Sequence, residues 1–356
     1  MTTKHLLGLS RRRALALSGL AAGAAVLPSL ARASHHFEVA AVRSNPKLGL
    51  TDLYVFNAPD GKHTVFVLNA NFSPKTGEPL LDASALYNIH CATSDDFKSG
   101  MTWAFASSGD RISCYQLDGA NGALGAKGRK LGDVTVGKKA QLPNGIKAWV
   151  GRIKDPFFGN SPGLHVYRAQ LAEGKYDPQV WEKASGKNIF LDRTCGSLVL
   201  EVPNAMLGGK INAFSTVAVQ KGSGWQQVQY MAKPLMAHTM LFEDEPLKAA
   251  FDASRPDTQK EFFNFFSARI ARSAHFAGGR DDAFAYADAT AKRLLPDVMP
   301  YEVGTQAAFT VDRINGRKFS DDGMSVVLSL LIGKTIDQHA KDLHNYQAAF
   351  PYVVSA

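Results

Sequence analysis

Cysteine is scarce in this chain, whose 356 residues include only Cys91, Cys114 and Cys195. None of the three belongs to a Cys-x-x-Cys or Cys-x-x-Cys-His motif, so zinc ribbons, thioredoxin-type redox centres and c-type haem attachment have no support. Three cysteines cannot all pair within one chain. The sequence therefore leaves two arrangements open, one disulfide with one buried thiol or three buried thiols. Cys91 and Cys114 are the candidate pair, because they lie in neighbouring strand-like segments.

Long apolar runs and the short motifs of familiar enzyme classes are also missing. Beyond the first 33 residues no stretch is long and apolar enough to cross a bilayer. The chain has no Gly-x-Ser-x-Gly elbow, no phosphate-binding loop ending in Gly-Lys-Ser/Thr and no Gly-x-Gly-x-x-Gly turn. A serine hydrolase of that type, a P-loop protein and a dinucleotide-binding protein therefore lack support.

The first residues have the pattern of an export signal. Arginines at 11–13 are followed by Leu15, an uncharged stretch to Leu30 and the sequence Ala31-Arg32-Ala33. A basic start, a short apolar run and a small-x-small site are typical of a signal peptide, and the paired arginines match the twin-arginine pattern. We expect the twin-arginine export machinery to carry the folded protein. Cleavage near Ala33 then gives a periplasmic or secreted chain that starts near Ser34.

The positive charge is concentrated in this signal. The whole chain has a formal charge of +8, and residues 1–33 hold five basic side chains and no acid. Subtracting five from +8 leaves +3 for the mature chain. A balance so close to neutral, with no basic run interleaved with aromatics, argues against a nucleic-acid partner.

The mature chain contains strand signals first and helix signals later. Short apolar segments separated by Gly and Pro turns are typical of an antiparallel sandwich; they lie at 53–56, 63–72, 85–91, 101–106, 111–117, 146–152, 196–202, 210–220 and 225–230. Helical spacing predicts helices that begin near 254–257 and span 282–295, 323–332 and 336–346. We expect residues 34–356 to form one domain of the α+β class, mainly an antiparallel β-sandwich. Its helices, at about 254–346, would pack over one face or end of the sheets.

Several segments, in this order, resemble a known family. They are Ser34-His35-His36, residues 51–56 and 59–60, Ala70-Asn71-Phe72, residues 154–158, 200–203 and 295–301, Asn315-Gly316-Arg317, Asp321-Asp322 and Phe350-Pro351-Tyr352. Together they are similar to the exported bacterial domain-of-unknown-function family 4331. The resemblance implies a β-rich exported protein of largely unassigned function. Residues 92–98 lack the alternating oxygen donors that calcium needs, where family members often carry an acidic loop, so this chain is identified as a divergent member.

The junction created by cleavage is the first candidate site. Cleavage after Ala33 would give an amine, two amide nitrogens and the third-position imidazole of His36, a square-planar set suited to Cu(II) or Ni(II). Cleavage one residue later would leave His35 as the terminus, with amine-plus-imidazole chelation. The alternative is an ordered arm in which His35 forms a hydrogen bond within the fold.

A second candidate is a metal site formed by folding. It combines His35 or His36 with Asp52 and a distant donor, for which His238, Asp155 and Asp321 are the options. Histidine with carboxylates suits zinc, iron or manganese. In the alternative interpretation, Asp52 caps a turn and Asp321 caps a helix.

These observations favour an exported, non-catalytic protein that binds a small ligand or a divalent metal such as copper, zinc or iron. Two other hypotheses stay open. One is a metal-dependent enzyme, either an oxidoreductase or a hydrolase, which requires several titratable side chains in one pocket. The other is a structural or surface interaction module, which requires a large exposed apolar patch.

The metal hypothesis makes a direct prediction. Protein purified from the periplasm should contain stoichiometric metal, and replacing His35 and His36 by alanine should remove it, because both candidate sites use these imidazoles. Elemental analysis of the two proteins measures this. Substoichiometric metal in both would contradict the hypothesis.

Overall fold

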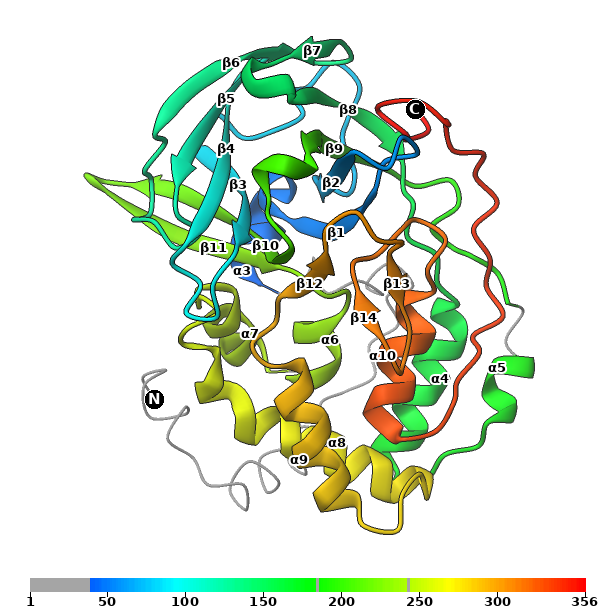
Figure 1. Cartoon of the computed structure of the whole chain (residues 1–356). Coiled ribbons are helices and arrows are strands. Elements are labelled where there is room, and N and C mark those ends of the chain that lie inside the picture. Colours follow the sequence, from blue (N-terminus) through cyan, green and yellow to red (C-terminus); the bar gives the residue numbers. More distant parts are fainter. Residues whose placement is uncertain (1–38, 184–185, 242–243) are drawn as a thin grey trace.

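The computed structural model describes residues 39–183, 186–241 and 244–356 (Figure 1). Two antiparallel sheets form its larger part. One has five strands, which in spatial order are β1 (Leu50–Asn57), β2 (His63–Ala70), β9 (Thr194–Pro203), β8 (Lys147–Lys154) and β7 (Lys139–Gln141). The other has seven strands, β11 (Gly224–Met231), β10 (Lys210–Lys221), β3 (Ala85–Ala92), β4 (Gly100–Ser108), β5 (Arg111–Asp118) and β6 (Arg129–Thr135), with β12 (Met299–Glu302) also on β10.

The sheets pack face to face, as alternating strand residues predict. One face of each sheet contributes to a common apolar core, and Phe66 of β2 meets Trp103 of β4 across it with ring centroids 5.4 Å apart. Both residues are fully buried. The prediction of a β-sandwich-like α+β fold is therefore confirmed. Among the described residues, no helix has the length and apolarity needed to cross a membrane.

The helices gather at one end of the sheets and beside them (Figure 1). They are α3 (Ala40–Ser44), α4 (Ser161–Ala172), α5 (Gln179–Lys183), α6 (Met236–Met240), α7 (Glu245–Asp252), α8 (Phe263–Ala277), α9 (Ala283–Leu294) and α10 (Gly323–Ile332). Short 3-10 turns are η3 (Pro46–Leu48), η4 (Pro143–Gly145), η5 (Asn204–Met206) and η6 (Gln259–Phe262), and a small hairpin pairs β13 (Ala308–Phe309) with β14 (Ile314–Asn315).

The two best-capped helices match the sequence prediction closely. Asp282 accepts hydrogen bonds from the first turn of α9, and Asp322 accepts one from Ser325 at the start of α10. Gly333 ends α10 in the left-handed conformation. Helix α4 was not predicted, although Asn160 caps it by accepting a hydrogen bond from Gly163. The helical part therefore begins earlier than residue 254.

The helix predicted at 336–346 does not form. This segment contains no helix or strand, and it runs along one side of the molecule toward the C-terminus (red in Figure 1). Its polar groups bond to distant segments instead: the Gln338 side chain accepts from the Asn160 amide at 2.7 Å, and His344 lies 3.0 Å from the Leu191 carbonyl. These tertiary hydrogen bonds replace those that a helix would make within itself.

The proposed Cys91–Cys114 disulfide is also wrong. Cys91 lies on β3 and Cys114 on β5, with β4 between the two strands, so two sheet spacings of about 4.8 Å each separate them. That exceeds the span of a disulfide. All three cysteines are free and buried, and burial raises the pKa of Cys91 and of Cys114 to about 12.

Buried, protonated thiols should be chemically inert in the folded protein. We predict that Cys91, Cys114 and Cys195 do not react with an aromatic disulfide reagent under native conditions, and that all three react after unfolding in guanidinium without reductant. A Ser223→Cys variant, whose thiol would sit in the exposed β10–β11 turn, should react at once and serves as the control. A yield below three thiols in the unfolded protein would show that a disulfide forms.

Candidate functional site

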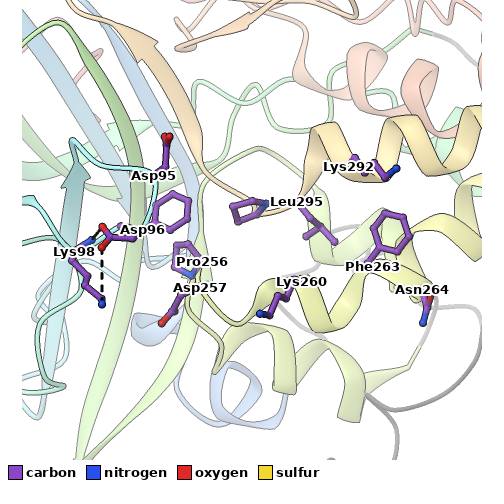
Figure 2. Close-up of a pocket in the computed structure, with 12 residues that line it drawn as sticks. Asp95, Asp96, Lys98, Pro256, Asp257, Lys260, Phe263, Asn264, Lys292 and Leu295 are labelled. Atoms are coloured by element: carbon purple, nitrogen blue, oxygen red, sulfur yellow. Dashed lines mark hydrogen bonds and ion pairs between the residues drawn. The ribbon is translucent and has the colours of Figure 1, made fainter.

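A recess lies between the β3–β4 loop and the ends of α8 and α9. We call it the β3–α9 groove; its volume is about 900 Å³ (Figure 2). The residues that line it are Asp95, Asp96, Phe97, Lys98, Pro256, Asp257, Lys260, Phe263, Asn264, Lys292, Leu295 and Pro296. They come from three segments that are far apart in the sequence.

The β3–β4 loop forms one wall and is held by its own side chains. Asp96 accepts hydrogen bonds from the Ser94 hydroxyl at 2.6 Å and from the Lys98 amide at 3.1 Å. Phe97, between Asp96 and Lys98 in the sequence, has a φ of 59°, a left-handed conformation that is unfavourable for a bulky residue. Phe97 is nevertheless buried, and it lines the groove. The loop therefore accepts local backbone strain of the kind that concentrates at functional sites.

The opposite wall rests on a buried polar cluster at the end of α9. Lys233 donates to the carbonyls of Leu294 and Pro296 at 3.0 and 3.2 Å and lies 3.4 Å from Asp297. Gln259 accepts from the Asp297 amide at 2.7 Å, which ties η6 to the same point. Burial lowers the pKa of Lys233 and raises that of Asp297. These contacts fix the wall that carries Lys260, Lys292 and Leu295.

The acidic side chains of the groove lie toward one end. Asp95, Asp96 and Asp257 lie there with Lys98, which pairs with Asp96, whereas Lys260 and Lys292 lie toward the other end, and the apolar Pro256 and Leu295 lie between them (Figure 2). A neighbouring recess of about 520 Å³ shares Phe97, Lys292, Leu295 and Pro296 with the groove and adds Arg293 and Arg313. Among the residues that the structure describes, no ion pair involves Lys260, Lys292, Arg293 or Arg313.

The residues predicted to bind metal have different surroundings. Asp52 of β1 is buried and forms an ion pair with Arg317, which precedes α10. Asp155 follows β8 and pairs with Arg193, whose Nε donates to it at 2.6 Å. Desolvation raises the pKa of Asp52 to about 6 despite Arg317, and the negative charge of Asp155 adds to the effect. The two candidate carboxylates therefore lie in one electrostatic cluster, each with an arginine.

Further polar side chains adjoin this cluster. Across the five-stranded sheet Asp52 pairs with Asn69, and Asn69 pairs with Ser197, so the three lie in one row. The Asn69 amide and the Ser197 hydroxyl are fully buried and find no hydrogen-bond partner among the described residues. Two carboxylates balanced by two arginines leave no net charge, and such a neutral polar interior is suited to ordered water.

Of the other predicted metal residues, Asp321 is near enough to Arg317 for the positive charge to act on its carboxylate, and His238 lies in α6. His238 is buried in α6, and Asp321 accepts from the Lys318 amide at 2.9 Å, so α10 is capped by Asp322 instead. His35 and His36 lie outside the described residues. Within the ranges that are described, no three His, Cys, Asp or Glu side chains lie together as a metal site. The set of His35, His36, Asp52 and His238 therefore stays a prediction.

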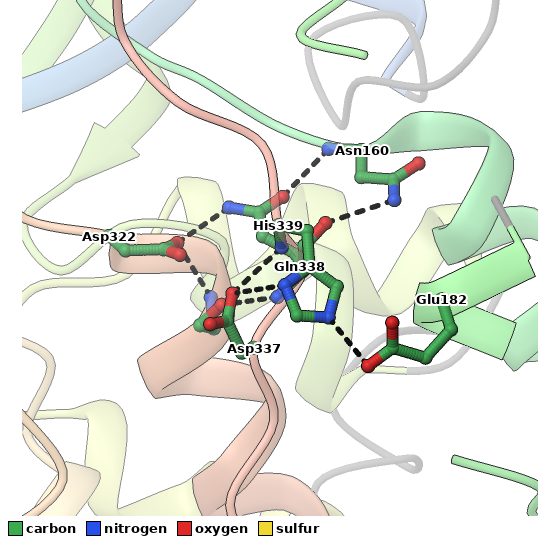
Figure 3. A network of polar contacts seen from close by, with 7 residues as sticks. Asn160, Glu182, Asp322, Asp337, Gln338 and His339 are labelled. Atoms are coloured by element: carbon green, nitrogen blue, oxygen red, sulfur yellow. Dashed lines mark hydrogen bonds and ion pairs between the residues drawn. The ribbon is translucent and has the colours of Figure 1, made fainter. Parts of the chain in front are cut away.

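A second polar network anchors the segment that replaces the expected last helix (Figure 3). Gln338 is fully buried; its side chain contacts the Asn160 amide and donates to Asp322 at 2.6 Å. Asn160 returns a hydrogen bond to the Gln338 carbonyl at 3.0 Å. His339 lies 3.1 Å from Glu182 at the surface. This network joins the starts of α4 and α10, and its contacts explain it as structural.

No family model, no curated protein and no solved structure matches the chain. The resemblance to the domain-of-unknown-function family 4331 therefore stays a prediction. The groove had only a weak signal in the sequence. Residues 92–98 lack the alternating oxygen donors of a calcium-binding loop, and no motif in them predicts a ligand site.

The raised pKa of Asp52 predicts a pH effect on stability. Its folded value of about 6 exceeds the unfolded value of about 3.9, so the folded state holds more protons between these values. The free energy of unfolding should therefore fall as the pH rises from about 4 to about 6.

Urea unfolding at pH 4.5 and 7 would measure this fall. In Asp52→Asn, which cannot ionise, the fall should be smaller by on the order of 2 kcal/mol. Asp281→Asn removes an exposed carboxylate and should behave like the unsubstituted protein. An unchanged slope in Asp52→Asn would contradict the role given to Asp52.

Proposed function

We propose that this chain is an exported, non-catalytic binding protein and that its ligand is a small molecule held in the β3–α9 groove. The observation that carries the proposal is the groove itself. Its volume of about 900 Å³ is within the range of ligand sites, about 300–1,000 Å³. Its walls combine apolar surface with charged side chains that can orient a ligand.

The construction of the groove supports the same proposal. Lys233, Gln259 and Asp297 hold one wall from beneath, and the hydrogen bonds of Asp96 hold the other. A wall that is already ordered loses little conformational entropy when a ligand binds. The left-handed backbone at Phe97 places a ring that both packs in the core and lines the groove.

Binding of a metal ion is the other version of this proposal. It rests on His35 and His36 and on the expected cleavage near Ala33, and elemental analysis tests it independently of the groove. Export to the periplasm by the twin-arginine route likewise rests on the sequence of residues 1–33. The groove proposal does not depend on either.

Filling the groove should abolish binding. We predict that at least one class of small organic compound raises the melting temperature of the folded protein by several degrees, because a ligand of the native state stabilises it. Lys260→Trp, which places an indole at an exposed position on the groove wall, should remove most of that shift. A thermal-shift screen of both proteins measures it.

Lys139→Trp is the matched control. Lys139 is exposed on β7, at the opposite end of the molecule from α9 (Figure 1), so its replacement should keep the full shift. Circular dichroism would confirm that both variants fold. Equal shifts in the protein with and without Lys260→Trp, or no shift with any compound, would contradict the proposal.

A further inference from the structure

The unpaired cations around the groove indicate which chemical class of ligand it takes. Lys292 and Arg293 lie in the last turn of α9, and Arg313 lies at the turn between β13 and β14. All three are exposed and line the recess that continues the groove. The acids at that end are fewer, since Asp312 is the one acidic side chain described as lining the same recess.

A structural role accounts for only part of this cluster. Basic residues in the last turn of a helix stabilise its dipole, so Lys292 and Arg293 have an explanation within α9. Arg313 does not, because it lies outside any helix. Its backbone is fixed by Thr310, whose hydroxyl accepts from the Arg313 amide at 3.0 Å and whose amide donates to the Arg313 carbonyl at 2.8 Å. The hairpin therefore holds a cation facing the same recess as Lys292.

The opposite end of the groove disfavours an anion. Asp95 and Asp257 are exposed there, Asp257 accepts from Asn121 at 3.3 Å, and Asp96 pairs with Lys98 at 4.0 Å. Asp95 also lines a further recess with Arg313 and Glu302, so Arg313 has acidic neighbours on that side. A negatively charged group would be attracted most to the recess where Lys292, Arg293 and Arg313 lie together and Asp312 is the acidic residue of the lining.

The groove also has an apolar lining. Phe97, Pro256, Phe263, Leu295 and Pro296 all line it. An inorganic anion would leave this surface exposed to water, whereas an apolar chain or ring would cover it and gain about 25 cal/mol for each Å² buried. The two features therefore call for one molecule with an apolar body and an anionic end.

We infer that the β3–α9 groove binds an amphipathic organic carboxylate, with its carboxylate at Lys292 and Arg313 and its apolar body against Phe97, Phe263 and Leu295. This inference rests on the proposed function, since it names the ligand class of the same site. It is independent of the metal hypothesis.

Calorimetry with three ten-carbon probes tests the inference: decanoate, the neutral decanol and the cation decyltrimethylammonium, each below its aggregation limit. Decanoate should bind at least about tenfold more tightly than either of the others, and its affinity should fall as salt increases. Lys292→Glu and Arg313→Glu should each weaken decanoate binding by about tenfold and improve binding of the cation. Lys139→Glu, an equal charge change far from the groove, should have no effect.

The outcomes separate the two proposals. If decanol or the cation binds as tightly as decanoate, and Lys260→Trp abolishes that binding, the groove is a ligand site but the carboxylate class is wrong. If the charge reversals leave decanoate binding unchanged, the assigned orientation is wrong. If Lys260→Trp leaves the binding of all three probes unchanged, the groove is not the site and both proposals fail.

Discussion

The architecture depends on Arg317, which ties the last third of the chain to its first strand. Its side chain pairs with Asp52, 265 residues away, while its backbone exchanges two hydrogen bonds with Val55, at 2.8 and 3.0 Å. Gly316 makes this approach feasible: it has a φ of 70°, and a Cβ there would lie 2.4 Å from the Val55 carbonyl. The same glycine donates to Pro300 at 2.7 Å. One short segment thus sets the distance between β1, β12 and α10.

The positions of the groove walls depend on these contacts of residues 316 and 317 with β1 and β12. Arg313 lies four residues before Arg317, and β12 continues from the α9 end that carries Lys292. Because β12 pairs with β10 and β10 pairs with β3, the β3–β4 loop with Phe97 is positioned by the same sheet. The buried pair is costly to desolvate, as the raised pKa of Asp52 indicates. The pair sets one position of the segment before α10 along β1, which helix packing alone would not determine.

The sequence predicted the parts of the fold that depend on local signals. Strand positions followed alternation and turns, and the helix predicted at 323–332 matches α10 to the residue. The prediction was wrong where contacts between residues far apart in the sequence determine the structure. The helical spacing at 336–346 was overridden when Gln338 bonded to Asn160 and Asp322. Neither the pairing of Asp52 with Arg317 nor a groove built from three separate segments leaves a local pattern, so the site had to come from the structure.

Long-range contacts also hold the last described residues against the five-stranded sheet. The chain ends at β8, where Lys154 donates to Val354 and Ala356 donates to Arg152, and Tyr352 donates to Glu201 of β9. Phe319, Phe350, Tyr352 and Val353 cover the outer face of the five-stranded sheet. Because these residues are far in sequence from the strands that they cover, this apolar layer depends on long-range contacts, as the groove does.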